Sequence, residues 1–274
     1  MSIKFASICP HPPIIIPTIG SSSDLKKVSK TIRAMEKLAK IFAKEKPDTV
    51  IIISPHGPVN YYKMTITMSP TLFGNFRSFG DYQTELNFEN DLEIVNILQE
   101  KCKEQKIPVR ITDAPQLDHG CLVPLYYLTK NYTLPREKTV KIVPIAYSYL
   151  DPKTHFEFGK KIFHICNAVN RIKNKRIAIV ASGDLSHRLS FGAPAGFSVR
   201  GEEFDEEFIK LLRKNDAKRI LNMDPDLIKD AGECGYLSTV ILLGALSEIK
   251  RSKFKALSYQ DPFGVGYLVG YFSI

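Results

Sequence analysis

The stretch "DTVIIISPHGP" (48–58) indicates the fold class of this chain. Its uninterrupted apolar run, residues 50–53, is typical of a strand buried on both faces, as at the centre of a parallel sheet. Pro55, Gly57 and Pro58 then stop the strand, because proline lacks an N–H and glycine permits a tight turn. The strand therefore delivers one imidazole, His56, at its carboxyl end.

Two further apolar strands end in the same way. "IKFASIC" (3–9) leads to His11 in "PHPP", and "RIAIVAS" (176–182) leads to His187 in "GDLSH". Ligand sites of open α/β sheets lie at the carboxyl edge of the strands. We therefore expect the three histidines to converge there, although they are far apart in the sequence.

The remaining chain alternates between strand and helix patterns. Further strands are predicted at 61–68, 109–112, 139–148, 254–260 and 266–274. One long helix is predicted to begin at the capping residues Ser21–Ser23, and other helices are predicted at 90–106, 121–130, 152–172, 200–213 and 235–249. The alternation within 61–68 suits an antiparallel strand, and no regular element is predicted from there to about residue 88. This order predicts an α/β fold in a single domain, residues 1–274, with a mostly parallel central sheet flanked by helices and a metal site at the carboxyl edge of the strands.

Composition narrows the classes of function. The net charge of +9 could suggest nucleic acid, but the lysines are spread over amphipathic segments such as residues 24–46, where a solvated helix face explains them. We expect no nucleic-acid partner, although a basic surface favours an anionic substrate. No run of 18 apolar residues and no signal peptide are visible, which predicts a cytoplasmic protein without a membrane partner. The five cysteines lack C-x-x-C spacing and are expected to be reduced thiols.

The histidines predict a divalent metal site. Prolines on either side of His11 and His56 hold both loops in one geometry, and a third, anionic ligand would complete a facial set. The candidates for that ligand are Glu233 and Cys234, in "AGECGYLS" (231–238). Glu233 is preferred because a carboxylate suits iron, and Cys234 is the alternative.

Three other side chains belong to the expected site. His119 lies in "LDHG", in a turn before a helix. Asp118 and Asp184 each lie close in sequence to a histidine that they could orient. His155 and His164 fall inside a predicted helix and are expected to be structural.

Six motifs together carry a family resemblance. They are "HPP" (11–13), "SPHGP" (54–58), "LDHGCLVPL" (117–125), "SGDLSH" (182–187), "GECG" (232–235) and "DPFGVGYLVG" (261–270). In this order they resemble the class III extradiol ring-cleavage dioxygenases, the superfamily of the protocatechuate 4,5-dioxygenase catalytic subunit. Within it, the chain looks closest to the dioxygenase-like proteins associated with AMMECR-type domains, with the Memo proteins as relatives.

The resemblance implies a function and a set of roles. Fe(II) would be held by His11, His56 and Glu233, while zinc could occupy the site in a purified sample. His187 would be the catalytic base and His119 a second acid/base group, with Asp184 and Asp118 setting histidine tautomers. The reaction would cleave the ring of a small aromatic diol with O₂, beside the diol. A homo-oligomer and an AMMECR-type partner are also implied.

Two alternatives use the same residues. A Memo-like metal-binding or redox-associated protein without ring-cleaving activity would have Cys234 as its third ligand. A zinc hydrolase would also suit two histidines, a carboxylate and a base, but the chain has no H-E-x-x-H signature.

Overall fold

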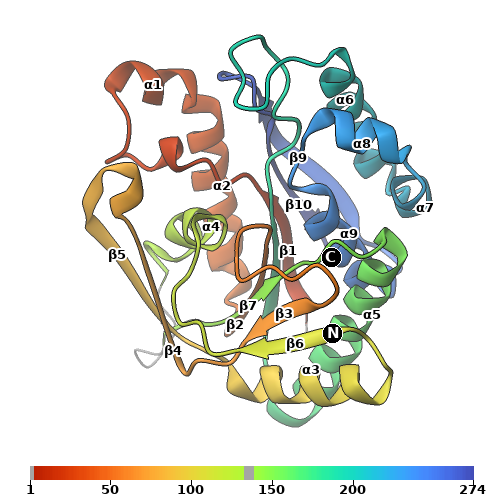
Figure 1. Ribbon diagram of the computed structural model, residues 1–274. Helices are drawn as coiled ribbons and strands as arrows, with labels where there is room; N and C mark the ends of the chain where they lie inside the picture. The colour runs from red at the N-terminus through yellow and green to blue at the C-terminus, as the bar shows by residue number, and fades with distance from the viewer. Residues whose placement is uncertain (1–2, 133–138) are drawn as a thin grey trace.

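A mixed eight-stranded sheet forms the centre of the protein, as the computed structural model shows for residues 3–132 and 139–274 (Figure 1). Its strand order is β6-β3-β7-β2-β8-β1-β10-β9, and β4 and β5 form a separate two-stranded sheet. The strands are β1 (Ile3–Cys9), β2 (Thr49–Ser54), β3 (Met64–Thr67), β4 (Thr71–Phe76), β5 (Asp81–Glu89), β6 (Val109–Thr112), β7 (Lys141–Ala146), β8 (Ile177–Ser182), β9 (Lys253–Gln260) and β10 (Tyr267–Ser273).

Helices cover both faces of this sheet (Figure 1). They are α1 (Ser22–Lys27), α2 (Ser29–Glu45), α3 (Leu92–Glu104), α4 (His119–Thr129), α5 (Pro152–Lys173), α6 (Val199–Lys214), α7 (Ala217–Leu221), α8 (Pro225–Ala231) and α9 (Tyr236–Leu246), with 3-10 turns η1 (Pro13–Ile15) and η2 (Arg77–Phe79). Among the described residues, no helix is both long and apolar enough to cross a bilayer.

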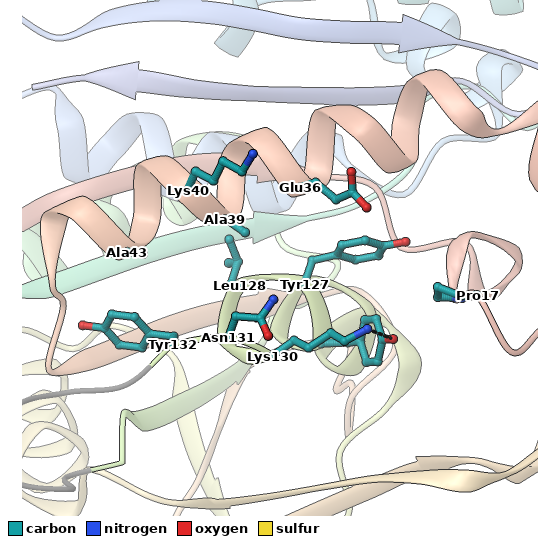
Figure 2. Close-up of a pocket in the computed structure, with 11 residues that line it drawn as sticks. Pro17, Glu36, Ala39, Lys40, Ala43, Tyr127, Leu128, Lys130, Asn131 and Tyr132 are labelled. Carbon is teal, nitrogen blue, oxygen red and sulfur yellow. Dashed lines mark hydrogen bonds between the residues drawn. The ribbon is translucent and has the colours of Figure 1, made fainter.

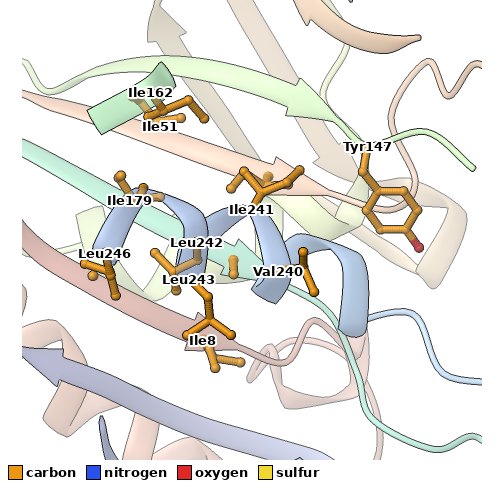
Figure 3. Close-up of a cluster of buried hydrophobic side chains, with 14 of the residues drawn as sticks. Ile8, Ile51, Tyr147, Ile162, Ile179, Val240, Ile241, Leu242, Leu243 and Leu246 are labelled. Atoms are coloured by element: carbon orange, nitrogen blue, oxygen red, sulfur yellow. The ribbon is translucent and has the colours of Figure 1, made fainter. Parts of the chain in front are cut away.

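The central strands alternate their side chains between two cores. In β2, Val50 and Ile52 pack with α2 and α4, whereas Ile51 and Ile53 pack with α3, α5 and α9. Figure 3 shows the second core, where the apolar side chains of α9 meet those of the strands. The predicted α/β fold with a mostly parallel sheet flanked by helices is confirmed, because β1, β8, β2 and β7 pair in parallel.

Helices α5 and α9 approach each other closely at two glycines. A Cβ on Gly159 would overlap the backbone of Ile241, and a Cβ on Gly244 would overlap the backbone of Phe156. Helix α9 is buried along almost its whole length and apolar on all sides, so it needs this close contact to exclude water.

Three parts of the fold differ from the sequence prediction. The segment with no predicted structure is the β4–β5 hairpin, whose β5 alternates exposed and half-buried residues and therefore shows no apolar run. Helices α7 and α8 were not predicted, because each is too short for a clear helical period. Strand β3 is antiparallel to β7, as its alternation suggested, but parallel to β6.

Candidate metal centre

Three potential metal ligands meet at the carboxyl edge of the sheet. His11 follows β1 and His56 follows β2, and their Nε2 atoms lie 3.0 Å apart. The Sγ of Cys234, from the turn before α9, lies 3.6 Å from His11 Nε2. Among the described residues, these three form the group that could hold a metal ion, with all ligand atoms within 4.8 Å of one another.

The spacing of these donors fits one ion. Metal–nitrogen bonds of about 2.0 Å and metal–sulfur bonds of about 2.3 Å place the ligand atoms of a shared ion roughly 3–4 Å apart. Imidazole and thiolate together suit zinc, copper or iron. The donor set therefore fits a transition metal and leaves further coordination positions for other ligands.

The tautomer of His11 is fixed by a serine and a carbonyl. The hydroxyl of Ser182 donates its one proton to the carbonyl of Gly120 at 2.5 Å, so it accepts a hydrogen bond from His11 Nδ1–H at 3.0 Å. The lone pair of His11 is thereby on Nε2, which faces His56 and Cys234. Burial and the neighbouring histidines hold the pKa of His11 well below its ordinary value, so the ring is neutral and ready to bind a metal.

Cys234 is held by the loop that follows β8. The backbone N–H of Asp184 donates to Cys234 Sγ at 3.2 Å, and the N–H of Cys234 donates to the carbonyl of Asp184 at 3.1 Å. Burial, followed by the charges of Asp184 and Glu233, raises the pKa of the Cys234 thiol well above its ordinary value. A metal ion would therefore have to displace a proton from this thiol when it binds.

Glu233, the preferred third ligand in the sequence prediction, lies outside this group. Its Oε2 accepts the backbone N–H of Tyr236 at 2.5 Å, at the start of α9. Burial raises the pKa of this carboxyl to about 8. The structure thus turns Glu233 toward a helix end and brings the alternative, Cys234, to the two histidines, because adjacent residues in this turn point in different directions.

The other two predicted histidines border the centre. The ring of His119 stacks on that of His56 with centroids 4.4 Å apart, and the ring of Phe79, from η2, meets the His119 ring edge-on with centroids 5.3 Å apart. The Nε2 of His187 lies 3.8 Å from Cys234 Sγ. Burial lowers the pKa of both histidines, that of His119 to about 4. Four imidazoles therefore gather around the same space: three follow strands of the sheet, and His119 is the first residue of α4.

The two predicted aspartates accept hydrogen bonds from loop backbone groups and from a serine, and Asp184 Oδ2 also lies 4.0 Å from His11 Nε2. Asp184 accepts the backbone N–H of His11 at 3.0 Å, and burial raises its pKa to about 7. Asp118 accepts from the Ser54 hydroxyl at 2.6 Å and caps α4 through the N–H of Cys121. They thus fix loop backbones, whereas Ser182, which the sequence reasoning missed, orients an imidazole. Its position as the last residue of β8 was the available signal.

The remaining histidines and a cavity between two helices lie elsewhere. His155 is buried on α5 and His164 is exposed on the same helix. A cavity of about 440 Å³ opens between α2 and α4, next to Pro17, and no histidine lines it (Figure 2). The candidate metal centre is thus a separate site at the sheet edge.

The fold and the centre define a class: an α/β protein in which the loops after two parallel strands bring two histidines to a cysteine of the turn before α9, as a candidate metal site. Residues 5–270 match the family model of the catalytic LigB subunit of aromatic ring-opening dioxygenase. The chain therefore belongs to the LigB family, as the resemblance of its motifs indicated.

Individual relatives refine this placement. The chain is 34% identical to Protein CA_C1420 of Clostridium acetobutylicum over 97% of its own length, and it spans only 57% of that relative. It is 25% identical to the MEMO1 family protein MJ0403 of Methanocaldococcus jannaschii, covering 92% of this chain and 75% of the relative. An uncharacterized Escherichia coli protein, JW3007, has the same fold, with a TM-score of 0.66, 18% identity and coverage of 98% and 99%.

Proposed function

We propose that this chain is a Memo-like, redox-associated member of the LigB family that binds one metal ion through His11, His56 and Cys234. The observation that carries the proposal is the separation of 3.6 Å between Cys234 Sγ and His11 Nε2, while the Glu233 carboxylate accepts a hydrogen bond from Tyr236. A thiolate in place of a carboxylate makes the centre softer and favours zinc, copper or iron over magnesium or calcium.

The protein groups prepare the site for a cation. The neutral His11 presents Nε2, and the N–H of Asp184 would stabilise a thiolate at Cys234. Once bound, the metal would supply Lewis acidity and open positions for an exogenous ligand. His187 and His119 then lie where they can hold or move a proton on that ligand.

The experiment that tests this assignment compares two neighbouring variants. Cys234→Ser should lose the metal, measured by elemental analysis after reconstitution with Fe(II) or Zn(II), whereas Glu233→Gln should retain it. His11→Ala and His56→Ala should also lose the metal, and His164→Ala, an exposed histidine on α5, is the control. Metal retained in Cys234→Ser but lost in Glu233→Gln would overturn the proposal in favour of a carboxylate centre.

Ring cleavage is the second candidate function. It is supported by the family match over residues 5–270 and by the two additional histidines at the centre. In this function Fe(II) is the resident metal, and a small aromatic diol and O₂ are the substrates. His187 Nε2 would accept the second phenolic proton of the diol, and His119 would donate a hydrogen bond to a diol oxygen.

Oxygen uptake separates the two functions. Protein reconstituted anaerobically with Fe(II) is mixed with a panel of catechols, and O₂ consumption and yellow ring-opened products are recorded. Uptake that His187→Ala abolishes without loss of iron would favour the dioxygenase. Tight metal binding without O₂ uptake with any diol would favour the Memo-like function. The single catalytic domain, a homo-oligomer and an AMMECR-type partner stay predictions, which sedimentation and co-expression can test.

A further inference from the structure

A buried carboxyl group lies behind the loop that carries His187. Asp205, on α6, is 0% exposed, and its Oδ1 accepts the backbone N–H of Ser186 at 2.8 Å. Its Oδ2 accepts the hydroxyl proton of Tyr259, on β9, at 2.6 Å. Ser186 is the residue directly before His187, so the carboxyl group holds the backbone from which the imidazole projects.

Other bonds tie the same backbone to the turn that carries Cys234. The carbonyl of Ala231 accepts both the Ser186 hydroxyl at 2.9 Å and the N–H of His187 at 3.1 Å. Ala231 lies three residues before Cys234. The N–H of Gly266 donates to the Ser186 carbonyl at 2.9 Å, and a Cβ on Gly266 would overlap Asp205 Oδ2. Asp205, Ala231 and Gly266 therefore hold Ser186 by hydrogen bonds from three parts of the chain.

The chemistry of Asp205 is unusual for a purely structural residue. Burial raises its pKa to about 7, opposed by the hydrogen bonds from Tyr259 and Ser186. Both partners that the structure describes are neutral donors, and burying a carboxyl group with only neutral donors costs stability. An apolar residue could fill the same volume but could not hold the Ser186 N–H.

We propose that Asp205 and Tyr259 are positioning residues, which hold His187 so that its Nε2 lies 3.8 Å from Cys234 Sγ. The inference rests on the proposed function, in which His187 acts on the ligand of the metal centre. Asp205 acts through the backbone N–H of Ser186, and Tyr259 acts through Asp205.

The test is NMR spectroscopy of the full chain, first without metal and then with Zn(II). In Asp205→Ala, hydrogen exchange at the Ser186 amide should accelerate about tenfold, because a hydrogen bond of about 1.4 kcal/mol is lost. The nuclear Overhauser effect between the His187 ring and the Cys234 Cβ protons should weaken at the same time. Asp205→Asn keeps an acceptor for Ser186 and should restore both signals. Glu206→Ala, an exposed acid beside Asp205 on α6, is the matched control.

A second variant keeps the test decisive if Asp205→Ala does not fold. Tyr259→Phe removes one hydroxyl from a residue that is 36% exposed, and it should accelerate exchange at Ser186 by a smaller factor. Unchanged exchange and an unchanged His187–Cys234 signal in the folded variants would overturn the proposal. Zn(II) affinity is measured on the same samples. A wild type that does not bind Zn(II) would contradict the proposed function, whereas unchanged exchange in the variants would contradict the positioning role of Asp205 and Tyr259, so the two outcomes are distinguishable.

Discussion

Ser182 orients His11 from the end of β8. Its hydroxyl accepts from His11 Nδ1 at 3.0 Å and donates to the carbonyl of Gly120 at 2.5 Å, so the serine links β1, β8 and the start of α4. Groups that bind the far nitrogen of a metal-ligating histidine fix its tautomer and ring orientation. The metal affinity of the centre should therefore depend on a side chain that does not bind the metal.

Ser182→Ala should weaken metal binding by about 10- to 100-fold, because His11 loses the acceptor for its Nδ1–H. The dissociation constant is measured by competition with a chromophoric chelator. Ser247→Ala, at the end of α9, removes a hydroxyl that also donates to a backbone carbonyl and serves as the control. Equal affinity in wild type and Ser182→Ala would show that the serine has no part in metal binding.

Metal should stabilise the fold through His11, His56 and Cys234. A ligand present at a concentration about 100 times its dissociation constant adds about 2.7 kcal/mol to the free energy of unfolding. For a chain of this size that corresponds to an increase of roughly 5–10 °C in Tm. Differential scanning fluorimetry with and without Zn(II), and after chelation, measures the shift. The shift should vanish in Cys234→Ser and persist in Glu233→Gln; the reverse pattern would contradict the ligand assignment.

The free energy of unfolding should fall as the pH rises through the pKa of Asp205. Burial raises its pKa from 3.8 to about 7, so the folded chain keeps a proton that the unfolded chain releases between these values. The stabilisation is complete below about pH 4 and is lost as the pH rises through about 7, by at most about 4 kcal/mol. Urea unfolding from pH 5 to 8 measures the slope. Asp205→Asn should make the slope shallower without abolishing it, because burial also raises the pKa of Asp184 and Glu233, while Asp113→Asn, at an exposed position, should leave it unchanged.

Gly159→Ala should destabilise the contact between α5 and α9. The added methyl group would overlap the carbonyl of Ile241 and the backbone nitrogen of Ala245, and backbone atoms cannot move aside as a side chain can. We expect a loss of about 1–3 kcal/mol, or more, in the free energy of unfolding. Gly192→Ala, where a Cβ meets nothing within 4 Å, is the control in the same denaturant titration. Equal losses of unfolding free energy in both variants would show that the close approach of α5 and α9 does not determine the cost of the added methyl group.

Much of the fold could be predicted because its signals are local. The apolar runs at 3–9, 49–54 and 177–182 are buried on both faces, and each ends at a Pro- or Gly-containing turn, so both the strands and their carboxyl ends were visible. The β4–β5 hairpin was missed since its strands lie outside the main sheet and β5 is largely exposed, which leaves no apolar periodicity.

The sequence by itself determined that histidines gather at one sheet edge, because parallel strands place their carboxyl ends together. It could not determine which member of the Glu233–Cys234 pair faces them. That depends on the turn before α9, where Glu233 accepts the N–H of Tyr236 and Cys234 pairs with the backbone of Asp184. Only tertiary structure decides such a choice, because the hydrogen bonds that orient the two neighbours come from different parts of the chain.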